Sequence, residues 1–383
     1  MIAYAPRIGF YMDDWFFLST FKYCPSQSFW GLYGCLYSGT PNAQPRPVQI
    51  FCLTALYKLA GLHPLGYQIF IAVSLVATVC MFYIVLRELR VPRLFALSVP
   101  MLYGLLPHYS TDRFWMASSQ SLVSMFFGFL CFYCVLRSAS ASRARMWWAV
   151  AAIVAFLVSA FGYEVFVPSV VLAPALYWYR ATQRSMQVGS GRSGFRRGFV
   201  ACSLAAAVLL LVVSAYKAVV TPRFQWDFLH RIPYVIYQAL FRAFNFNFGY
   251  YGLGLPAVAW NAVWFYPDTE SLILAALLAI AIFGYFFWIL RSEQPRFPGR
   301  AAWAVLLGVG LVVYALGYAP VFAYPILYLT STDPENRIAL AAAVGAAILI
   351  VSLLGCVVSL VRANHMRAGI FTFLIMILRY RGS

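Results

Sequence analysis

Residues 65–86 read LGYQIFIAVSLVATVCMFYIVL, and they set the class of protein to expect. The stretch contains no charged side chain and is followed at once by Arg87. A helix of about 20 apolar residues is long enough to cross the hydrocarbon core of a bilayer. Inside lipid the backbone must satisfy its own hydrogen bonds, which an α-helix does within one segment. The stretch therefore predicts a transmembrane helix.

Apolar runs of this kind recur along the chain. The sequence is 63% hydrophobic and only 10% charged, whereas soluble globular proteins are roughly 25% charged. We expect full spans at residues 65–86, 94–106, 115–136, 147–163, 165–179, 198–220, 271–290, 301–322 and 338–361. A terminal apolar run, residues 370–378, is too short to cross. The predicted fold class is an all-α polytopic transmembrane protein with these nine spans and partial terminal segments.

The charged residues are divided between the two ends of these spans. Most arginines fall in one set of loops, at residues 87–93, 137–145, 180–197, 291–300 and 362–367. The other set holds nine of the 11 acidic residues: Asp13, Asp14, Asp112, Glu164, Asp227, Asp268, Glu270, Asp333 and Glu335. Cytoplasmic loops carry an excess of Lys and Arg, so the acidic loops are predicted to be extracytoplasmic. The net charge of +17 therefore reports topology and does not indicate a nucleic-acid surface.

The sequence predicts a single transmembrane domain over residues 1–383. Its parts are an outer loop with an interfacial helix (1–64), a first group of core spans (65–180), a basic cytoplasmic linker (181–197), and C-terminal spans with a large outer loop at 221–269 (198–383). The first 12 residues are too few for a span. Either a helix precedes the acidic residues in a longer chain, or the chain begins with a half-span.

Two cysteine pairs allow different predictions. Cys131 and Cys134 lie within a predicted span without His or acidic neighbours, which indicates buried thiols and no metal site. Cys24 and Cys35 share one polar loop, and they can form a disulfide if that loop is extracytoplasmic.

Asp13 and Asp14 are adjacent in the stretch YMDDWFF, residues 11–17. One carboxylate can act as general base on an acceptor hydroxyl. Its neighbour can hold the acceptor, bind a divalent cation, or raise the pKa of its partner. The alternative is a membrane-boundary loop, where acids contact water and aromatics form an interfacial belt. The grouping of acids on one side favours catalysis, with either Asp13 or Asp14 as the base and the need for a cation left open.

Further ionisable residues lie at the outer ends of predicted spans, where such groups are costly and commonly functional. Arg337 is the best candidate for binding phosphate, because its guanidinium offers two parallel donors; the alternative is a salt bridge with Asp333 or Glu335. Glu164 has wholly apolar flanks and either binds substrate or contacts water at a helical turn. The substrate-binding candidates are Arg46, His108, Asp112, Arg113, Glu164 and Arg337.

The order of these motifs resembles that of the GT-C superfamily of polytopic glycosyltransferases, in the branch of protein O-mannosyltransferases and their bacterial relatives. The matching motifs are Asp13-Asp14, RPV at 46–48 with GLHPLGY at 61–67, PHY at 107–109 with FWMA at 114–117, Tyr163-Glu164 with Pro168, and Asn336-Arg337. The likeness is clearest over residues 1–180. Two departures are the absence of a helix before the acidic pair and Tyr163 where relatives often carry Lys.

The resemblance implies a GT-C-like fold and an inverting enzyme that uses Asp13 or Asp14 as base. The donor would be a polyprenyl-phosphate sugar, and the acceptor a hydroxyl of a protein, lipid or glycan. The implied location is a bacterial inner membrane, with the active site on the extracytoplasmic side. A lipid-linked sugar transporter or a polysaccharide polymerase is the alternative, although the internal repeats typical of transporters are not visible.

Overall fold

The structure is a computed structural model. It describes residues 8–41, 43–141, 143–188, 193–221, 300–320 and 339–360, with isolated positions between 233 and 285. Every element in these residues is a helix and none is a strand, which confirms the all-α prediction. Most of the predicted span at 271–290 and of the loop at 221–269, and all of the run at 370–378, lie outside the described residues.

The chain divides into two compact units. The first consists of residues 1–89 and 110–229, and the second of residues 90–109 and 230–383. Each unit therefore combines segments that are distant in the sequence. The boundaries of the two units differ from those of the four parts predicted from the sequence.

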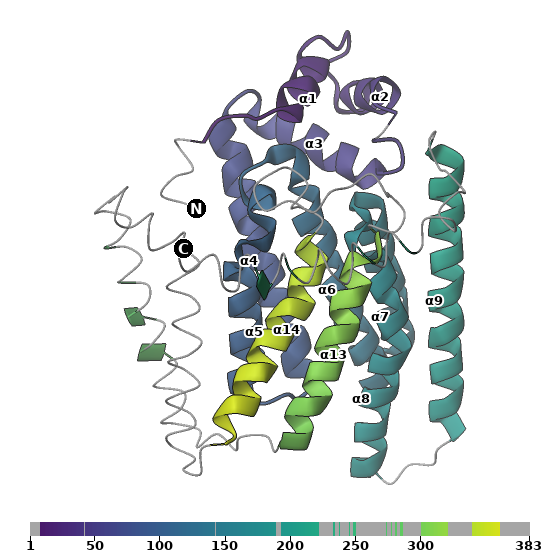
Figure 1. The fold of residues 1–383 in the computed structure, drawn as a ribbon. Helices are drawn as coiled ribbons and strands as arrows, with labels where there is room; N and C mark the ends of the chain where they lie inside the picture. Colours follow the sequence, from purple (N-terminus) through teal and green to yellow (C-terminus); the bar gives the residue numbers. More distant parts are fainter. Residues whose placement is uncertain are drawn as a thin grey trace. The chain divides into compact units, whose positions relative to one another are not determined.

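Six of the described helices are long and apolar enough to cross a membrane, which indicates an integral membrane protein. Five of them each overlap one predicted span as a single α-helix. The sixth, α6, covers its predicted span together with the short 3₁₀ turn that precedes it. In Figure 1 they are α4 (Pro64–Glu88), α6 (Gln120–Ser140), α7 (Arg145–Gly162), α9 (Ser193–Val220), α13 (Arg300–Tyr318) and α14 (Ala339–Val358).

Two predicted spans take another form. Residues 94–106 form α5 (Arg93–Leu105), whose 13 residues extend only about 20 Å at 1.5 Å per residue. Residues 165–179 begin as a 3₁₀-helix, η4 (Glu164–Leu172), and continue as α8 (Ala173–Val188). Pro168 lies inside η4 and removes one backbone donor that a regular α-helix would use.

The segment after the acidic pair is helical, which corrects the prediction of a loop. It contains α1 (Asp13–Lys22) and α2 (Phe29–Gly39), and α3 (Pro47–Ala60) follows. The Gly, Ser and aromatic residues of this segment have low helix propensity. Propensity is a weak influence, and tertiary packing overrides it here. The 14 residues of α3 are too few to span a bilayer, which agrees with a short interfacial helix within residues 1–64.

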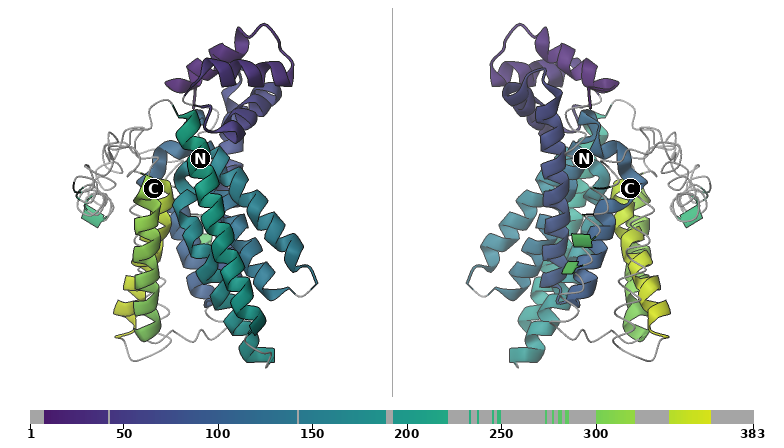
Figure 2. Two further views of the ribbon diagram at one scale, coloured as in Figure 1. Left: turned by 90° about the vertical axis from the view of Figure 1, so that its right-hand side faces the viewer. Right: turned by 90° about the vertical axis from the view of Figure 1, so that its left-hand side faces the viewer.

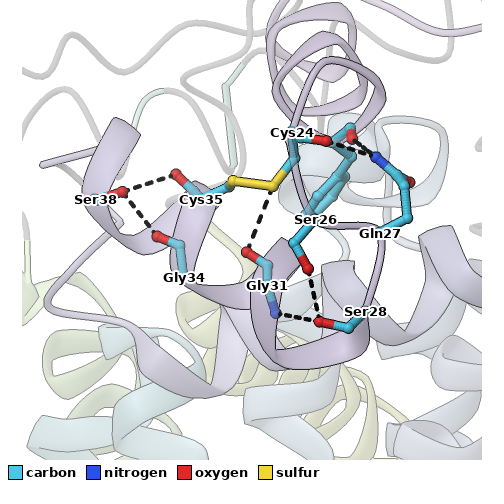
Figure 3. Close-up of a disulfide and its surroundings, with 9 residues drawn as sticks. Cys24, Ser26, Gln27, Ser28, Gly31, Gly34, Cys35 and Ser38 are labelled. Atoms are coloured by element: carbon cyan, nitrogen blue, oxygen red, sulfur yellow. Dashed lines mark hydrogen bonds between the residues drawn. A yellow bond between two sulfur atoms is a disulfide. The ribbon is translucent and has the colours of Figure 1, made fainter.

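Cys24 and Cys35 form a disulfide, with their Cα atoms 6.2 Å apart, a pairing that the sequence left open (Figure 3). Gln27 Nε2 donates to the Cys24 carbonyl oxygen (3.0 Å), a group left open after α1. Ser28 Oγ accepts the Gly31 N–H (3.1 Å) and so caps α2. The disulfide thus ties the end of α1 to α2 across a short, hydrogen-bonded turn.

The predicted basic linker at 181–197 is helical where the structure describes it, and its residues 189–192 lie outside the described residues. α8 continues to Val188, and α9 begins at Ser193. Arg, Gln and Met favour helix nearly as well as Leu. The polar residues therefore prolong the two apolar helices instead of ending them.

In the first unit, α6 packs against both α4 and α7, and α1, α2 and α3 lie at one end of these helices (Figures 1 and 2). Phe82 of α4 stacks on Phe129 of α6, with ring centroids 4.6 Å apart. Ser124 of α6 and Ser159 of α7 each donate to the carbonyl oxygen of the other (2.9 and 2.8 Å). Such packing and interhelical hydrogen bonds hold helices together where lipid removes the hydrophobic drive.

The chain reverses direction at Tyr163, whose φ of −158° and ψ of 148° are extended. Directly after it, Glu164 pairs with Arg46, which precedes α3. Further on, Arg180 of α8 pairs with Glu88, the last residue of α4. The segment from Glu164 to Arg180 therefore runs from one end of the unit to the other. We call these ends the Asp14 end and the Glu88 end.

In the second unit, glycine lets α13 and α14 meet backbone to backbone. A Cβ added at Gly345 would lie 2.3 Å from the Tyr314 backbone nitrogen, and one at Gly317 would lie 2.4 Å from that of Ala342. Small residues allow this close approach in membranes, where van der Waals packing drives association.

We expect Gly345→Ala to destabilise the protein by about 1–3 kcal/mol, because the new methyl overlaps backbone that cannot rotate away. Gly308→Ala is the matched control, since no atom lies within 4 Å of a Cβ at this position of α13. Thermal unfolding in detergent measures both. Equal unfolding midpoints for the two variants would contradict the close contact.

Candidate functional site

Asp14 is the buried member of the acidic pair, with 1% of its surface exposed. Its Oδ2 accepts the Tyr11 N–H (3.0 Å), and its Oδ1 accepts the Ala117 N–H (2.8 Å). Met12, between Tyr11 and α1, has φ 41° and ψ −111°, a conformation that costs a non-glycine residue about 1–3 kcal/mol. Asp14 thus fixes the start of α1 to the turn that contains Ala117, against local strain.

Burial raises the pKa of Asp14 to about 6, because a carboxylate loses its hydration there. Hydrogen bonds from the backbone of Tyr11, Ala117 and Met116 oppose this rise, and the charge of Asp13 adds to it. The elevated pKa shows that desolvation outweighs three backbone contacts. The burial that holds Asp14 in place therefore makes its charged form less favourable.

Asp13 has the opposite environment. It is exposed, and within the part of the chain that the structure describes its carboxylate forms no ion pair or hydrogen bond. Both residues lie in the first turn of α1, where the helix dipole favours negative charge. The pair therefore combines one fixed carboxylate with one that is open to an incoming group.

The turn η3 (Met116–Ser118) joins the acidic pair to Asp112, at the end of η2 (Pro107–Arg113). Asp112 is fully buried, and its Oδ1 accepts hydrogen bonds from the hydroxyls of Ser118 and Ser121 (2.6 Å from Ser121). The Ala117 carbonyl oxygen accepts from Gln49 Nε2 of α3 (3.5 Å). Two carboxylates and α3 are thus gathered around one short turn.

Glu164 binds two cations at the same end. Arg46 donates from Nε to Oε2 (2.9 Å) and from a terminal nitrogen to Oε1, and Lys217 Nζ donates to Oε2 (3.0 Å). The Arg46 guanidinium also lies 4.3 Å from the ring centroid of Tyr163. These four residues are largely buried, and the three charged ones carry one positive charge in excess. We call Arg46, Glu164 and Lys217 the cation cluster.

The cluster sets the charge of Glu164. Burial by itself raises the pKa of this carboxyl, but the attraction of Arg46 and Lys217 more than offsets it and holds the pKa well below its usual range. The alternative that Glu164 simply contacts water is therefore excluded. Lys217 has three N–H donors, of which one is used by Glu164.

The structure brings most of the predicted site residues to the Asp14 end. Gln49 links the groups: it lies one helical turn after Arg46 and contacts Ala117, which holds Asp14. The predicted residues at this end are Asp13, Asp14, Arg46, Asp112, Arg113 and Glu164. The side chain of His108 and all of Arg337 lie outside the described residues.

Lys217 was missed by the sequence analysis. It lies in the last turn of α9, near the end of an otherwise apolar span, and a lone Lys there was the available signal. It stands beside Glu164, to which its Nζ donates a hydrogen bond of 3.0 Å. Among the described residues no group of three or more His, Cys, Asp or Glu side chains is placed to hold a metal. Cys131 and Cys134 are buried free thiols, as predicted.

No family model, curated protein or solved structure matches this chain.

The raised pKa of Asp14 predicts a pH-dependent stability. An acid whose pKa is higher in the folded state favours folding when protonated, so this contribution is complete below its usual pKa of 3.8 and is lost as the pH rises through about 6. We expect the free energy of unfolding to fall by about 3 kcal/mol across that window. Unfolding measured from pH 4 to pH 7 should show this slope in Asp13→Asn and not in Asp14→Asn. A slope that persists in Asp14→Asn would assign it to other groups.

The cation cluster predicts an asymmetry between two substitutions. Glu164→Gln leaves two buried cations without a counter-charge, and we expect a loss of about 3–5 kcal/mol. Lys217→Met removes the excess cation and keeps the Arg46–Glu164 pair, so we expect a change within about 1 kcal/mol. Thermal unfolding in detergent compares them. Similar losses in both variants would show that Lys217 is needed to neutralise Glu164.

Proposed function

We propose that the protein is a membrane glycosyltransferase. It moves a sugar from a polyprenyl-phosphate donor to a hydroxyl acceptor, with inversion at the anomeric carbon. The observation that carries the proposal is the pairing, at one end of the first unit, of an exposed carboxylate on a fixed helix start with a cluster that has excess positive charge. The order of the motifs, which resembles the GT-C superfamily, supports the same reading.

Asp13 is the proposed general base. It accepts the proton of the acceptor hydroxyl as that oxygen attacks the anomeric carbon. The new glycosidic bond forms on one face of the sugar while the bond to the phosphate oxygen breaks on the other. A single displacement of this kind inverts the anomeric centre. The proton ends on Asp13, and the bonding electrons leave with the polyprenyl phosphate.

Asp14 is a positioning residue in this proposal. Both of its oxygens are occupied by backbone N–H groups, so it is poorly placed to take a proton from a substrate. Its hydrogen bonds instead hold the first turn of α1 against the strained Met12. Precise placement of a catalytic group accounts for a large share of enzymatic rate enhancement.

The cation cluster is the proposed partner of the departing phosphate. Negative charge grows on the leaving oxygen during transfer, and fixed donors stabilise it without reorganisation. Lys217 has donors that Glu164 does not use. Arg46 and Lys217 are the phosphate-binding residues proposed among the described ones, and Glu164 holds both cations in place. Arg337 stays a predicted phosphate ligand.

The proposed location is the inner (plasma) membrane of a bacterium, with the site on the extracytoplasmic side. The disulfide between Cys24 and Cys35 supports this side, because such bonds persist in oxidising compartments. It also lies next to α1, so the helix that carries Asp13 is covalently tied to α2. The distribution of arginines and acids supports the same orientation.

The transfer assay uses membranes that contain the protein and a radiolabelled polyprenyl-phosphate sugar. We expect Asp13→Asn to lower the transfer rate by about 10²–10⁴-fold, the usual contribution of a general base. Ser19→Ala is the control on the same helix, because Ser19 is exposed and bonds only to the Phe16 carbonyl oxygen. Unchanged transfer in Asp13→Asn would sink the mechanism, whatever the rate of Asp14→Asn.

A further arm tests the phosphate side of the same proposal. Lys217→Met is expected to fold and to weaken use of the donor by about tenfold, through loss of a hydrogen bond between charged groups. A rate equal to that of the unsubstituted protein at low donor concentration would remove Lys217 from the mechanism.

A further inference from the structure

The Glu88 end of the first unit carries far more positive than negative charge. Among the described residues of this end, Glu88 is the single acid. The basic residues around it are Arg87, Arg137, Arg143, Arg145, Arg180 and Arg184. Lys and Arg at the end of a membrane span attract anionic lipid head groups. The question is whether any of them is placed to bind one specifically.

Arg180 and Arg184 are occupied by the protein. Arg180 donates to Ser140 Oγ (2.8 Å), Gln183 Oε1 (3.4 Å) and Glu88 Oε1 (2.7 Å). Arg184 donates to the Ser140 carbonyl oxygen. These contacts tie α8 to the ends of α4 and α6. Both guanidinium groups therefore stabilise the packing of these helices.

Arg137 is different. Its nearest carboxylate oxygen, Glu88 Oε2, is 3.8 Å away, beyond a normal hydrogen bond. Its Nε is buried without an acceptor, and within the part of the chain that the structure describes the side chain makes no hydrogen bond. The guanidinium lies 5.6 Å from the ring centroid of Trp148, and 43% of the side chain is exposed. Arg137 is thus a half-exposed cation near Glu88 and Trp148. Its five N–H donors form no hydrogen bond with the described residues.

Large apolar side chains surround this end. Met146 and Trp147, at the start of α7, are 73% and 77% exposed, and Trp178 and Tyr179 of α8 are each 46% exposed. Trp and Tyr favour the level of the lipid head groups, where one side of the ring is apolar and the other wet. The surroundings of Arg137 therefore match a ligand that joins an anionic group to hydrocarbon.

We propose that Arg137 is the centre of a binding site for the phosphate group of an anionic phospholipid. The guanidinium donates two parallel hydrogen bonds to phosphate oxygens, and it lies over the Trp148 ring, 5.6 Å from the centroid. Glu88, held by Arg180, keeps Arg137 near the helix ends, while the exposed Arg143 and Arg145 add longer-range attraction. The site lies at the end of the unit opposite Asp13, and it does not rest on the proposed transfer reaction.

The test titrates the full-length protein in detergent with phosphatidylglycerol or with phosphatidylcholine, and native mass spectrometry measures bound lipid. We expect Arg137→Gln to weaken phosphatidylglycerol binding by about tenfold, as for one lost hydrogen bond between charged groups. Arg143→Gln removes the same charge from an exposed position and should change binding by less than about twofold, because exposed charges are screened. Binding of phosphatidylcholine should be equal in all forms.

A conservative substitution and a competition with inorganic phosphate test the same site. Arg137→Lys preserves the charge and the apolar stem, so it should fold and still lose affinity, because an ammonium cannot donate in parallel. Inorganic phosphate should not displace the lipid, since it lacks acyl chains. Equal losses in Arg137→Gln and Arg143→Gln, full affinity in Arg137→Lys, or displacement by inorganic phosphate would each overturn a specific lipid site.

Discussion

Glu164 joins segments that are far apart in the sequence. Its carboxylate meets Arg46, just before α3, and Lys217, in the last turn of α9. A buried carboxylate costs several kcal/mol unless it is paired, so α3, the turn after α7 and α9 have to meet. Once α3 is fixed, Gln49 reaches the Ala117 carbonyl oxygen, and the Ala117 N–H reaches Asp14. The acidic pair thus owes its position to an ion pair that does not touch it.

Much of this arrangement could be predicted because charge in an apolar chain is rare and costly. Residues 65–86 match α4 closely, since length and composition alone identify a span. Glu164 was identified because it interrupts an apolar context between two predicted spans, and Asp14 and Arg46 because they are ionisable residues of the first outer loop. The charge bias of the loops then assigned all three to the same side, and the structure places them at one end of the first unit.

The partners of these residues could not be predicted, because pairing depends on tertiary contacts. Arg46 and Glu164 are 118 residues apart, and no local pattern connects them. Lys217 went unnoticed in an apolar helix, where a lone Lys near the end also fits a side chain that extends to the interface. The helices α1 and α2 escaped prediction for a related reason: their stability comes from packing and from the Cys24–Cys35 disulfide, whereas their residues have weak helix propensity.

The two ends of the first unit share one arrangement, a glutamate paired with basic residues, but they differ in what surrounds it. At each end one largely buried glutamate gathers cations from distant helices: Glu164 binds Arg46 and Lys217, and Glu88 binds Arg180 with Arg137 nearby. Among the described residues of the unit, only the first end adds an exposed carboxylate, on a helix start that is held by hydrogen bonds. Cations alone bind an anion, but group transfer also requires a group that accepts a proton. That difference is why the proposed chemistry is assigned to the Asp14 end and the proposed lipid site to the other.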